Sequence, residues 1–311
     1  MQSEKNKNNL LVLVGPTAVG KTDLSIELAK RVNGEIISAD SRLLYKGMNI
    51  GTAKPTIQER RDIPHYLIDV ACPDETWSVA AFQQEASLKI EAVHQKGKLP
   101  ILVGGTGQYV FSILQGWTLE TQKIDIKLRQ VLTAWGNEIG AQELYQKLKI
   151  VDPDAASFIQ YQNIRRTVRA LEVILSSGEK FSKQRKKTGS PYNHLIVGLN
   201  RSRSELYQRI DQRIENMINQ GLIEETKVLL TKGYTSDLPS FSAIGYREMV
   251  SVIKGEISME EAVVLLKRMT RQFVRRQANW FKPGDPDIHW FEMDNGTIER
   301  VEHLVKDYFN K

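Results

Sequence analysis

The fold of this 311-residue chain is decided by one stretch, Gly15-Pro16-Thr17-Ala18-Val19-Gly20-Lys21-Thr22. It matches the phosphate-loop pattern in full: glycine, four residues, glycine, lysine and threonine. The apolar run 10–14 before it predicts a buried strand, and 22–32 after it has apolar residues at helical spacing. Such a turn presents backbone N–H groups and a helix N-terminus to phosphate oxygens, so we expect all eight residues to bind a diphosphate or triphosphate.

Two side chains of this loop add chemistry of their own. Lys21 supplies a point charge, and Thr22 is the expected ligand for Mg²⁺ or a phosphate oxygen. A chance glycine-rich turn is the competing interpretation. The strand and helix on either side of the loop argue against it.

The first third of the chain alternates apolar runs with helical patterns. Predicted strands cover 10–14, 35–39, 66–70 and 101–103, predicted helices cover 22–32 and 82–94, and a last strand follows at 195–199. This order predicts an α/β fold, with a parallel sheet flanked by helices like that of P-loop NTPases. Ligands of such sheets lie at the carboxyl ends of the strands.

The alternation stops near Trp117 and gives way to helical periodicity. We therefore expect a catalytic core formed by 1–118 and 195–311, with an inserted helical subdomain at 119–194. The insertion has 13 basic and 8 acidic residues, and 267–282 has six basic residues and no acidic one. A charge run is usually a solvated face. Two such segments on a phosphate-binding core are better explained by a bound RNA.

Composition excludes several other classes of protein. The chain is 41% hydrophobic and 26% charged with a net charge of +6, which is typical of a folded globular protein. One cysteine allows no internal disulfide and no cysteine-based zinc finger. The polar N-terminus and the absence of a membrane-length apolar run predict a cytoplasmic protein without a membrane partner.

Asp40 follows the second predicted strand and so lies beside the expected phosphate site. Three roles remain open for it: binding a ribose hydroxyl, capping a turn with Ser41, or acting as a general base. An ATPase needs a further acidic residue that ends a later strand, whereas 101–103 is followed by Gly104-Gly105-Thr106-Gly107. The sequence therefore indicates a phosphate-containing substrate without indicating ATP.

Across nearly its whole length the chain resembles the tRNA dimethylallyltransferases (tRNA isopentenyltransferases). The matching stretches, in order, are the phosphate loop, Asp40-Ser41 with Tyr45, Gly51-Thr52-Ala53-Lys54-Pro55, Pro64-His65, Leu67-Ile68-Asp69, Val103-Gly104-Gly105-Thr106-Gly107 with Tyr109, Arg169-Ala170-Leu171-Glu172, Arg209-Ile210-Asp211-Gln212-Arg213, Ile244-Gly245-Tyr246, and Arg275-Arg276-Gln277 with Trp280. The chain departs from the pattern where Leu43 replaces a common Gln, Asn49 a common Asp and Tyr66 a common second His.

The resemblance implies transfer of a dimethylallyl group from dimethylallyl diphosphate to N6 of adenosine 37 in the anticodon stem-loop of tRNA. It implies that Asp40 is the base, and that Thr17, Lys21, Thr22 and Arg213 stabilise the leaving diphosphate with Mg²⁺. We expect the protein to act as a monomer. The expected tRNA contacts are Asp40, Ser41, Arg42, Leu43, Thr106, Arg165, Arg166, Arg169, Arg271, Arg275 and Arg276.

The arginines of the predicted helix at 203–222 illustrate how much rests on the resemblance. Arg209 and Arg213 are four residues apart and share a helical face. Spacing alone favours a solvated face with Glu205 and Asp211 as ion-pair partners. Only the resemblance gives Arg213 a catalytic role.

Three other functions compete with the prenyltransferase hypothesis. A phosphate-loop kinase of a small metabolite would need the missing acidic strand end. A prenyltransferase that modifies free adenine nucleotides would not need the basic insertion. An RNA-binding protein without enzymatic activity would not need an intact phosphate loop.

Overall fold

The computed structural model describes residues 7–118, 125–183 and 186–310. The chain divides into two compact units: Met1–Leu114 with Ser190–Lys311, and Gln115–Gly189. The second unit falls in the region where the sequence predicts an insertion at 119–194. A role for this unit in binding RNA stays a prediction.

A parallel six-stranded sheet organises the first unit within the described part of the chain. Its strands lie side by side in the order β3-β2-β4-β1-β7-β8. Their bounds are β1 Asn9–Val14, β2 Gly34–Ser38, β3 His65–Tyr66, β4 Leu99–Val103, β7 Asn193–Asn200 and β8 Ile288–Glu292. The predicted α/β class with a parallel sheet is confirmed.

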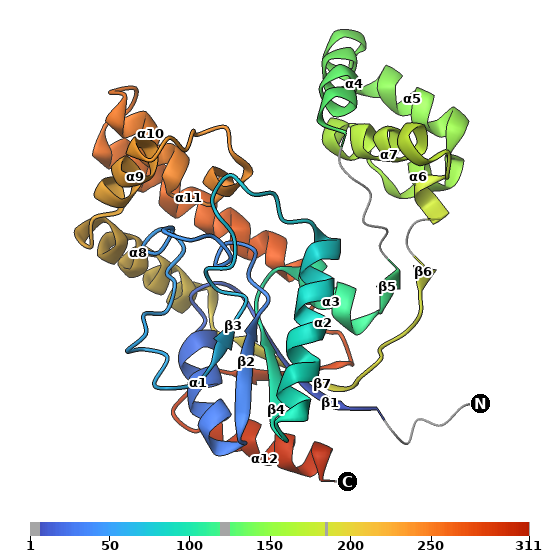
Figure 1. The fold of residues 1–311 in the computed structure, drawn as a ribbon. Coiled ribbons are helices and arrows are strands. Elements are labelled where there is room, and N and C mark those ends of the chain that lie inside the picture. Colours follow the sequence, from blue (N-terminus) through green and yellow to red (C-terminus); the bar gives the residue numbers. More distant parts are fainter. Residues whose placement is uncertain (1–6, 119–124, 184–185, 311) are drawn as a thin grey trace. The chain divides into compact units, whose positions relative to one another are not determined.

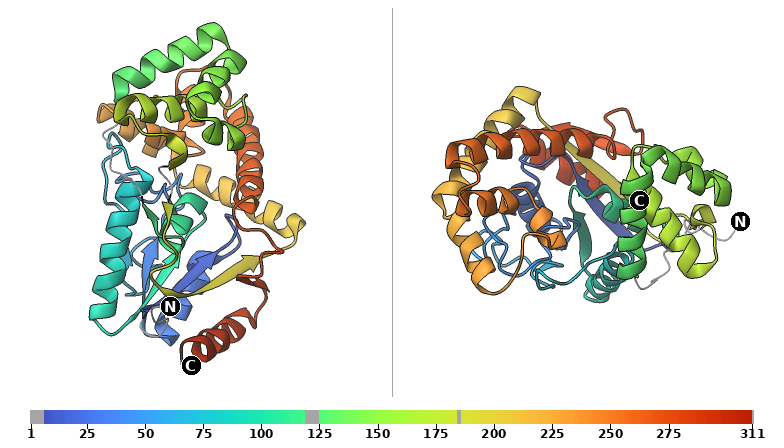
Figure 2. Two further views of the ribbon diagram at one scale, coloured as in Figure 1. Left: turned by 90° about the vertical axis from the view of Figure 1, so that its right-hand side faces the viewer. Right: turned by 90° about the horizontal axis from the view of Figure 1, so that it is seen from above.

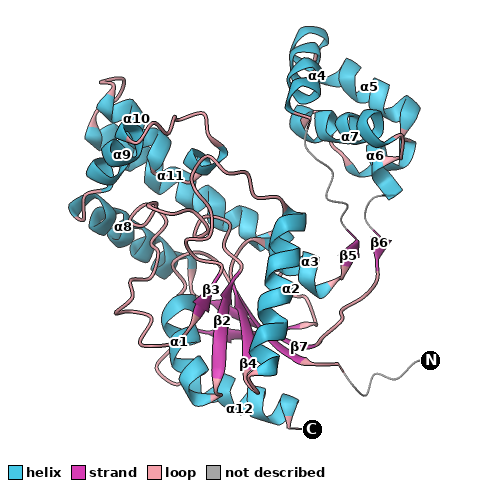
Figure 3. Cartoon of the chain, in the orientation of Figure 1, coloured by secondary structure: helices cyan, strands magenta, loops and turns pink. Residues whose placement is uncertain are grey.

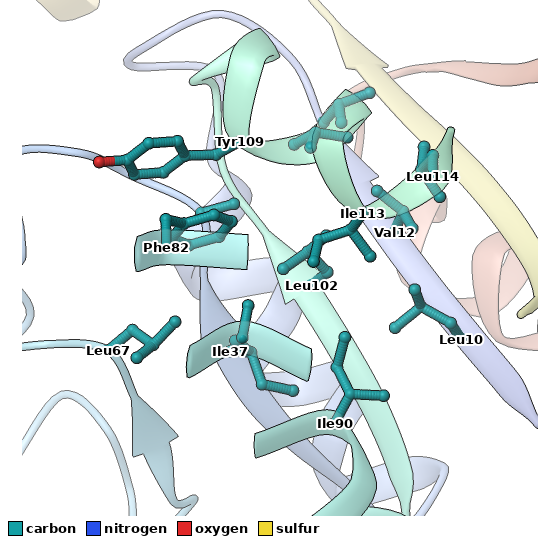
Figure 4. Packing of buried hydrophobic residues seen from close by; sticks show 14 of the residues in the cluster. Leu10, Val12, Ile37, Leu67, Phe82, Ile90, Leu102, Tyr109, Ile113 and Leu114 are labelled. Carbon is teal, nitrogen blue, oxygen red and sulfur yellow. The ribbon is translucent and has the colours of Figure 1, made fainter. Parts of the chain in front are cut away.

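Alternate side chains of the central strands build two apolar layers. Leu10, Val12 and Val14 of β1 pack with α2 (Val79–Gln95) and α3 (Gly107–Leu114) on one face, where Phe82 stacks on Tyr109 at a ring distance of 3.9 Å (Figure 4). The opposite residues of β1 pack with α1 (Lys21–Arg31) and α12 (Thr297–Phe309). Figure 2 shows α2 running alongside the strands. Because both faces are covered, the central strands are continuous apolar runs.

A group of helices completes the first unit and lies apart from the layers on the sheet (Figure 1). It contains α8 (Arg203–Asn219), α9 (Leu222–Thr231), the 3₁₀ turn Pro239–Ser242, α10 (Tyr246–Ile253) and α11 (Met259–Ala278). Their apolar faces share a core around the fully buried Phe241 and Tyr246. This core includes Tyr45 and Met48, so it also anchors the segment that follows Asp40.

The second unit is mainly helical (Figure 3). Its elements are α4 (Ile126–Ile139), α5 (Ala141–Val151), α6 (Pro153–Phe158), α7 (Ile164–Ser177) and the 3₁₀ turn Phe181–Lys183, together with a two-stranded antiparallel ribbon of β5 (Trp117–Thr118) and β6 (Lys186–Lys187). Helices α4, α5 and α7 bury a small core of their own around Leu144 and Leu148. Among the residues with described positions, no helix is both long and apolar enough to cross a membrane.

The predicted strand at 66–70 is wrong beyond its first residue. Only His65–Tyr66 pairs with the sheet, because Leu67 and Asp69 have left-handed backbone angles, φ +60° and +56°. Lys54 donates to the carboxylate of Asp69 at 2.5 Å, which stabilises this turn. Strand β8 is a half-exposed edge strand, so it lacks the continuous apolar run by which the sequence analysis located buried strands.

Candidate active site

The phosphate loop connects β1 to α1, as its sequence predicts. Gly15 has φ +146°, and a Cβ there would lie 2.6 Å from the carbonyl oxygen of Leu199. Gly20 caps α1 with φ +111°. Between them Ala18 has φ +64°, a left-handed backbone angle that residues other than glycine rarely adopt.

Lys21 folds back over its own loop. Its ammonium donates to the carbonyls of Gly15 at 2.9 Å and Pro16 at 2.7 Å. Burial lowers the pKa of Lys21 to about 8, the negative charge of Asp40 opposes this change, and Arg213 adds to it. Carbonyl oxygens therefore hold a positive charge for which a phosphate would be a stronger partner.

Asp40, just after β2, and Arg213, on α8, lie close enough for their charges to interact. Burial lowers the pKa of the Arg213 guanidinium, and the negative charge of Asp40 acts against that shift. Arg213 also donates to the hydroxyl of Thr17 at 3.4 Å. Of the three residues predicted to be catalytic, Arg213 thus contacts Thr17, and the charge of Asp40 acts on both Arg213 and Lys21.

The residues after Asp40 form a tight turn above the end of β2. The Asp40 carboxylate accepts from the Arg42 backbone N–H at 2.9 Å, so it caps this turn in addition to any catalytic role. Thr106 lies at the same place, since its hydroxyl accepts from the Ser41 N–H at 3.1 Å. The guanidinium of Arg42 donates to the carbonyl of Pro239 at 3.3 Å.

Leu43 is half-buried. Its carbonyl accepts from the backbone N–H of Asp69 at 3.1 Å. This contact ties the turn after Asp40 to the left-handed turn that follows β3.

Close packing within the protein explains why the positions after β4 are glycines. A Cβ on Gly104 would lie 2.3 Å from the Ala39 carbonyl oxygen, one on Gly105 2.0 Å from Nε2 of Gln277, and one on Gly107 2.2 Å from the Trp280 ring. These contacts leave no space for a side chain. They also put α11 directly against the end of β4.

Arginines outside the phosphate-loop motif hold the loop, a role that the sequence pattern did not indicate. Arg209 donates to the carbonyl of Ala18 at 2.7 Å, and Arg201 to that of Val19 at 2.9 Å. Arg209 is exposed, whereas Arg213 is half-buried, and the predicted ion pairs of these two arginines with Glu205 and Asp211 are wrong. Asp211 pairs instead with Arg271, and Glu205 with Arg201.

The predicted tRNA contacts of the second unit differ in their surroundings. Arg165 and Arg166 are exposed, and Arg166 lies over the ring of Phe158. Arg169 instead pairs at 3.1 Å with Glu172, a carboxylate that is 1% exposed and also bound by Arg129 at 2.7 Å. Arg169 is therefore already paired within the protein, whereas the other two arginines are exposed; tRNA binding by all three stays a prediction.

The predicted tRNA contacts on helix α11 also divide into exposed arginines and one that is paired within the protein. Arg275 and Arg276 are exposed. Arg271 is held by both oxygens of Asp211 at 2.8 Å and lies 4.8 Å from the ring centroid of Tyr207. Its charge is thus already neutralised within the protein.

Comparison with known proteins decides the family. The family model for IPP transferases matches residues 43–284, and a tRNA dimethylallyltransferase of Alkaliphilus metalliredigens is 44% identical over 310 residues, covering 98% of this chain and 99% of that protein. The chain belongs to the IPP transferase family. A tRNA dimethylallyltransferase of Bacillus pumilus is 46% identical, with 93% of this chain and 91% of that protein covered.

Solved structures of IPP transferases support the same conclusion. The full-length tRNA isopentenylpyrophosphate transferase of Bacillus halodurans aligns with a TM-score of 0.73 at 41% identity, over 98% of this chain and 97% of that one. A eukaryotic dimethylallyltransferase acting on tRNA aligns with a TM-score of 0.83 at 28% identity, over 97% and 80%. The predicted family, its P-loop NTPase-like fold and the assignment as a tRNA-modifying prenyltransferase are confirmed.

Proposed function

We propose that the protein transfers the dimethylallyl group of dimethylallyl diphosphate to N6 of adenosine 37 in tRNA, releasing diphosphate. The observation that carries this proposal is the geometry of the loop: Lys21 folds over it, Arg213 from α8 donates to Thr17, and the turn at Asp40 begins where β2 ends beside it. It supplies two cations for a diphosphate and one carboxylate for an amine proton. Membership of the IPP transferase family supports the same reaction.

The phosphate loop binds the donor. Free backbone N–H groups of the loop and the N-terminus of α1 surround the diphosphate, and Lys21 exchanges its carbonyl partners for phosphate oxygens. As the allylic C–O bond breaks, its electron pair stays on the diphosphate. Arg213 and Thr17 then stabilise the additional negative charge.

A divalent metal ion, Mg²⁺ in our proposal, fits this site. Within the described residues no group of three or more His, Cys, Asp or Glu side chains could hold a metal. The hydroxyl of the exposed Thr22 would hold the ion on the protein side, together with oxygens of the bound diphosphate, because Mg²⁺ usually binds at phosphates with few protein ligands. When bound, the ion neutralises charge on the leaving diphosphate.

Asp40 acts as the general base. The adenine amine is a weak nucleophile, because its lone pair is delocalised into the ring. N6 forms a bond to the allylic carbon while Asp40 accepts a proton from the amine, so the product carries no extra charge. Ser41, Arg42, Leu43 and Thr106 surround the turn at Asp40 and contact the nucleotide in this proposal.

The tRNA anticodon stem-loop is held by basic side chains outside this site. Arg165 and Arg166 of the second unit and Arg275 and Arg276 of α11 are exposed and contact phosphates in our proposal. Within the second unit Arg169 supports α7, and within the first unit Arg271 supports α11. The enzyme acts as a cytoplasmic monomer.

One assay tests the reaction against its competitors. The protein is incubated with labelled dimethylallyl diphosphate and Mg²⁺, together with unmodified tRNA, AMP or ATP. Label that appears only in tRNA, and only when adenosine is present at position 37, supports the proposal. Label in AMP or ATP, or no transfer at all, overturns it.

A further inference from the structure

Gln277 connects two parts of the site that are far apart in sequence. It lies near the end of α11 and is 5% exposed. Its side-chain oxygen accepts from the backbone N–H of Thr17 at 2.9 Å, 260 positions away. Its side-chain nitrogen donates to the carbonyl of Gly105 at 3.3 Å.

The chemistry of the two partners determines which way the amide faces. A backbone N–H can only donate, and a carbonyl can only accept. The Gln277 oxygen must therefore face Thr17 and its nitrogen must face Gly105. A carboxylate or a thioether of similar length cannot form both bonds.

The amide of Gln277 occupies the space where a side chain at position 105 would lie. A Cβ on Gly105 would lie 2.0 Å from Nε2 and 3.2 Å from Cδ of Gln277, while the next neighbour, the Gly15 carbonyl oxygen, is at an ordinary 3.5 Å. The φ angle of Gly105 lies outside the left-handed region, so an alanine backbone is possible there. The Gln277 side chain is the main obstacle to any side chain at this position.

The bond to Gln277 determines what Thr17 can do. The Thr17 N–H points to Gln277, so the contribution of Thr17 comes from its side chain. Its hydroxyl accepts from Arg213 at 3.4 Å, which leaves the O–H free to donate to a diphosphate oxygen. Any shift of Gln277 would move this hydroxyl.

We propose that Gln277 is a positioning residue that holds Thr17 and the phosphate loop against the end of β4 in the arrangement needed for group transfer. This inference rests on the proposed function. Because Gln277 acts on the loop and not on the tRNA surface, its loss should slow the chemical step and leave tRNA affinity unchanged.

The first test compares two variants with wild type in single-turnover transfer with saturating donor and tRNA. We expect Gln277→Met, which keeps the length and removes both bonds, to slow transfer at least about tenfold, because two hydrogen bonds that position the loop are lost. The Kd for tRNA should change less than about twofold. Gln272→Ala, at an exposed position on the same helix, is the matched control and should match wild type.

A double-mutant cycle tests the geometry separately. Gly105→Ala should displace the amide and slow transfer at least as much as Gln277→Met. In Gln277→Ala the obstacle is absent, so adding Gly105→Ala should cause little further loss. Thermal unfolding of each variant separates slower chemistry from loss of fold.

The inference is overturned if Gln277→Met transfers at the wild-type rate, if its loss lies only in tRNA affinity, or if the two alanine changes are fully additive. These outcomes differ from failure of the proposed function. If the proposed function failed, the wild-type protein itself would not transfer label to tRNA.

Discussion

The guanidinium of Arg209 donates to the backbone carbonyl of Ala18 at 2.7 Å, across 191 positions of sequence. Ala18 is the residue of the phosphate loop with a left-handed backbone and a side chain, φ +64°. Such an angle costs about 1–2 kcal/mol outside glycine. The tertiary contact from α8 thus stabilises a strained part of the loop.

Substitution of Ala18 should show this strain directly. Ala18→Gly should change the free energy of unfolding by less than about 1 kcal/mol, because relief of strain offsets the greater entropy of the unfolded chain. Ala18→Val should destabilise by about 2 kcal/mol or more, since a β-branched residue tolerates this angle poorly. Urea denaturation measures both. Equal stability of the valine variant and wild type would mean that the loop does not hold this angle.

Asp40→Asn should separate catalysis from binding. Asparagine keeps the shape and the acceptor for the Arg42 N–H but cannot take a proton. We expect single-turnover transfer to fall about 10²–10⁴-fold with little change in tRNA affinity. Lys21→Ala is the comparison, and it should also raise the KM for the donor. Near-normal chemistry in Asp40→Asn would make Asp40 a turn-capping residue.

Donor binding should weaken as the pH rises through about 8, because burial lowers the pKa of Lys21 to about 8. Below this pH the free enzyme carries the positive charge, and above it the charge is lost. Phosphate groups of the donor no longer titrate in that range, since their last pKa is about 6. Calorimetric titration with dimethylallyl diphosphate from pH 7 to 9.5 measures the effect.

Two variants check this assignment. Lys21→Met should bind weakly with a flat pH profile. In Asp40→Asn the midpoint should move to lower pH, since the charge of Asp40 favours protonated Lys21. An unchanged pH profile in Lys21→Met would assign the titration to another group.

The arginines of α7 should divide into binding and structural residues. Arg165→Ala with Arg166→Ala should weaken tRNA binding and reduce the slope of log Kd against log salt by about 2, without affecting donor binding. Arg169→Ala should instead lower stability by about 1–2 kcal/mol, because Glu172 is buried and loses one of its two cations. Filter binding at several salt concentrations and thermal unfolding distinguish the two effects. Salt-independent binding would argue against RNA as the substrate.

The strand, loop and helix that bind phosphate could be predicted because they are contiguous. Residues from Asn9 to Arg31 carry their own apolar periodicity and glycine positions, so local order alone indicated β1, the loop and α1. Asp40 could be located in the same way, since parallel strands end at one edge of the sheet. The edge strand β8 and the early end of β3 were beyond such reasoning, because partial exposure and a left-handed turn interrupt the apolar pattern.

The sequence by itself therefore determined the fold class, the phosphate loop and the place of Asp40. Only the tertiary structure decided that Arg209 and Gln277 support the loop, and that Arg169 and Arg271 pair with carboxylates of the protein itself. A charge or an amide on a helix looks the same in sequence whether it faces solvent or a distant turn. Its role depends on contacts between residues up to 260 positions apart, which no local periodicity encodes.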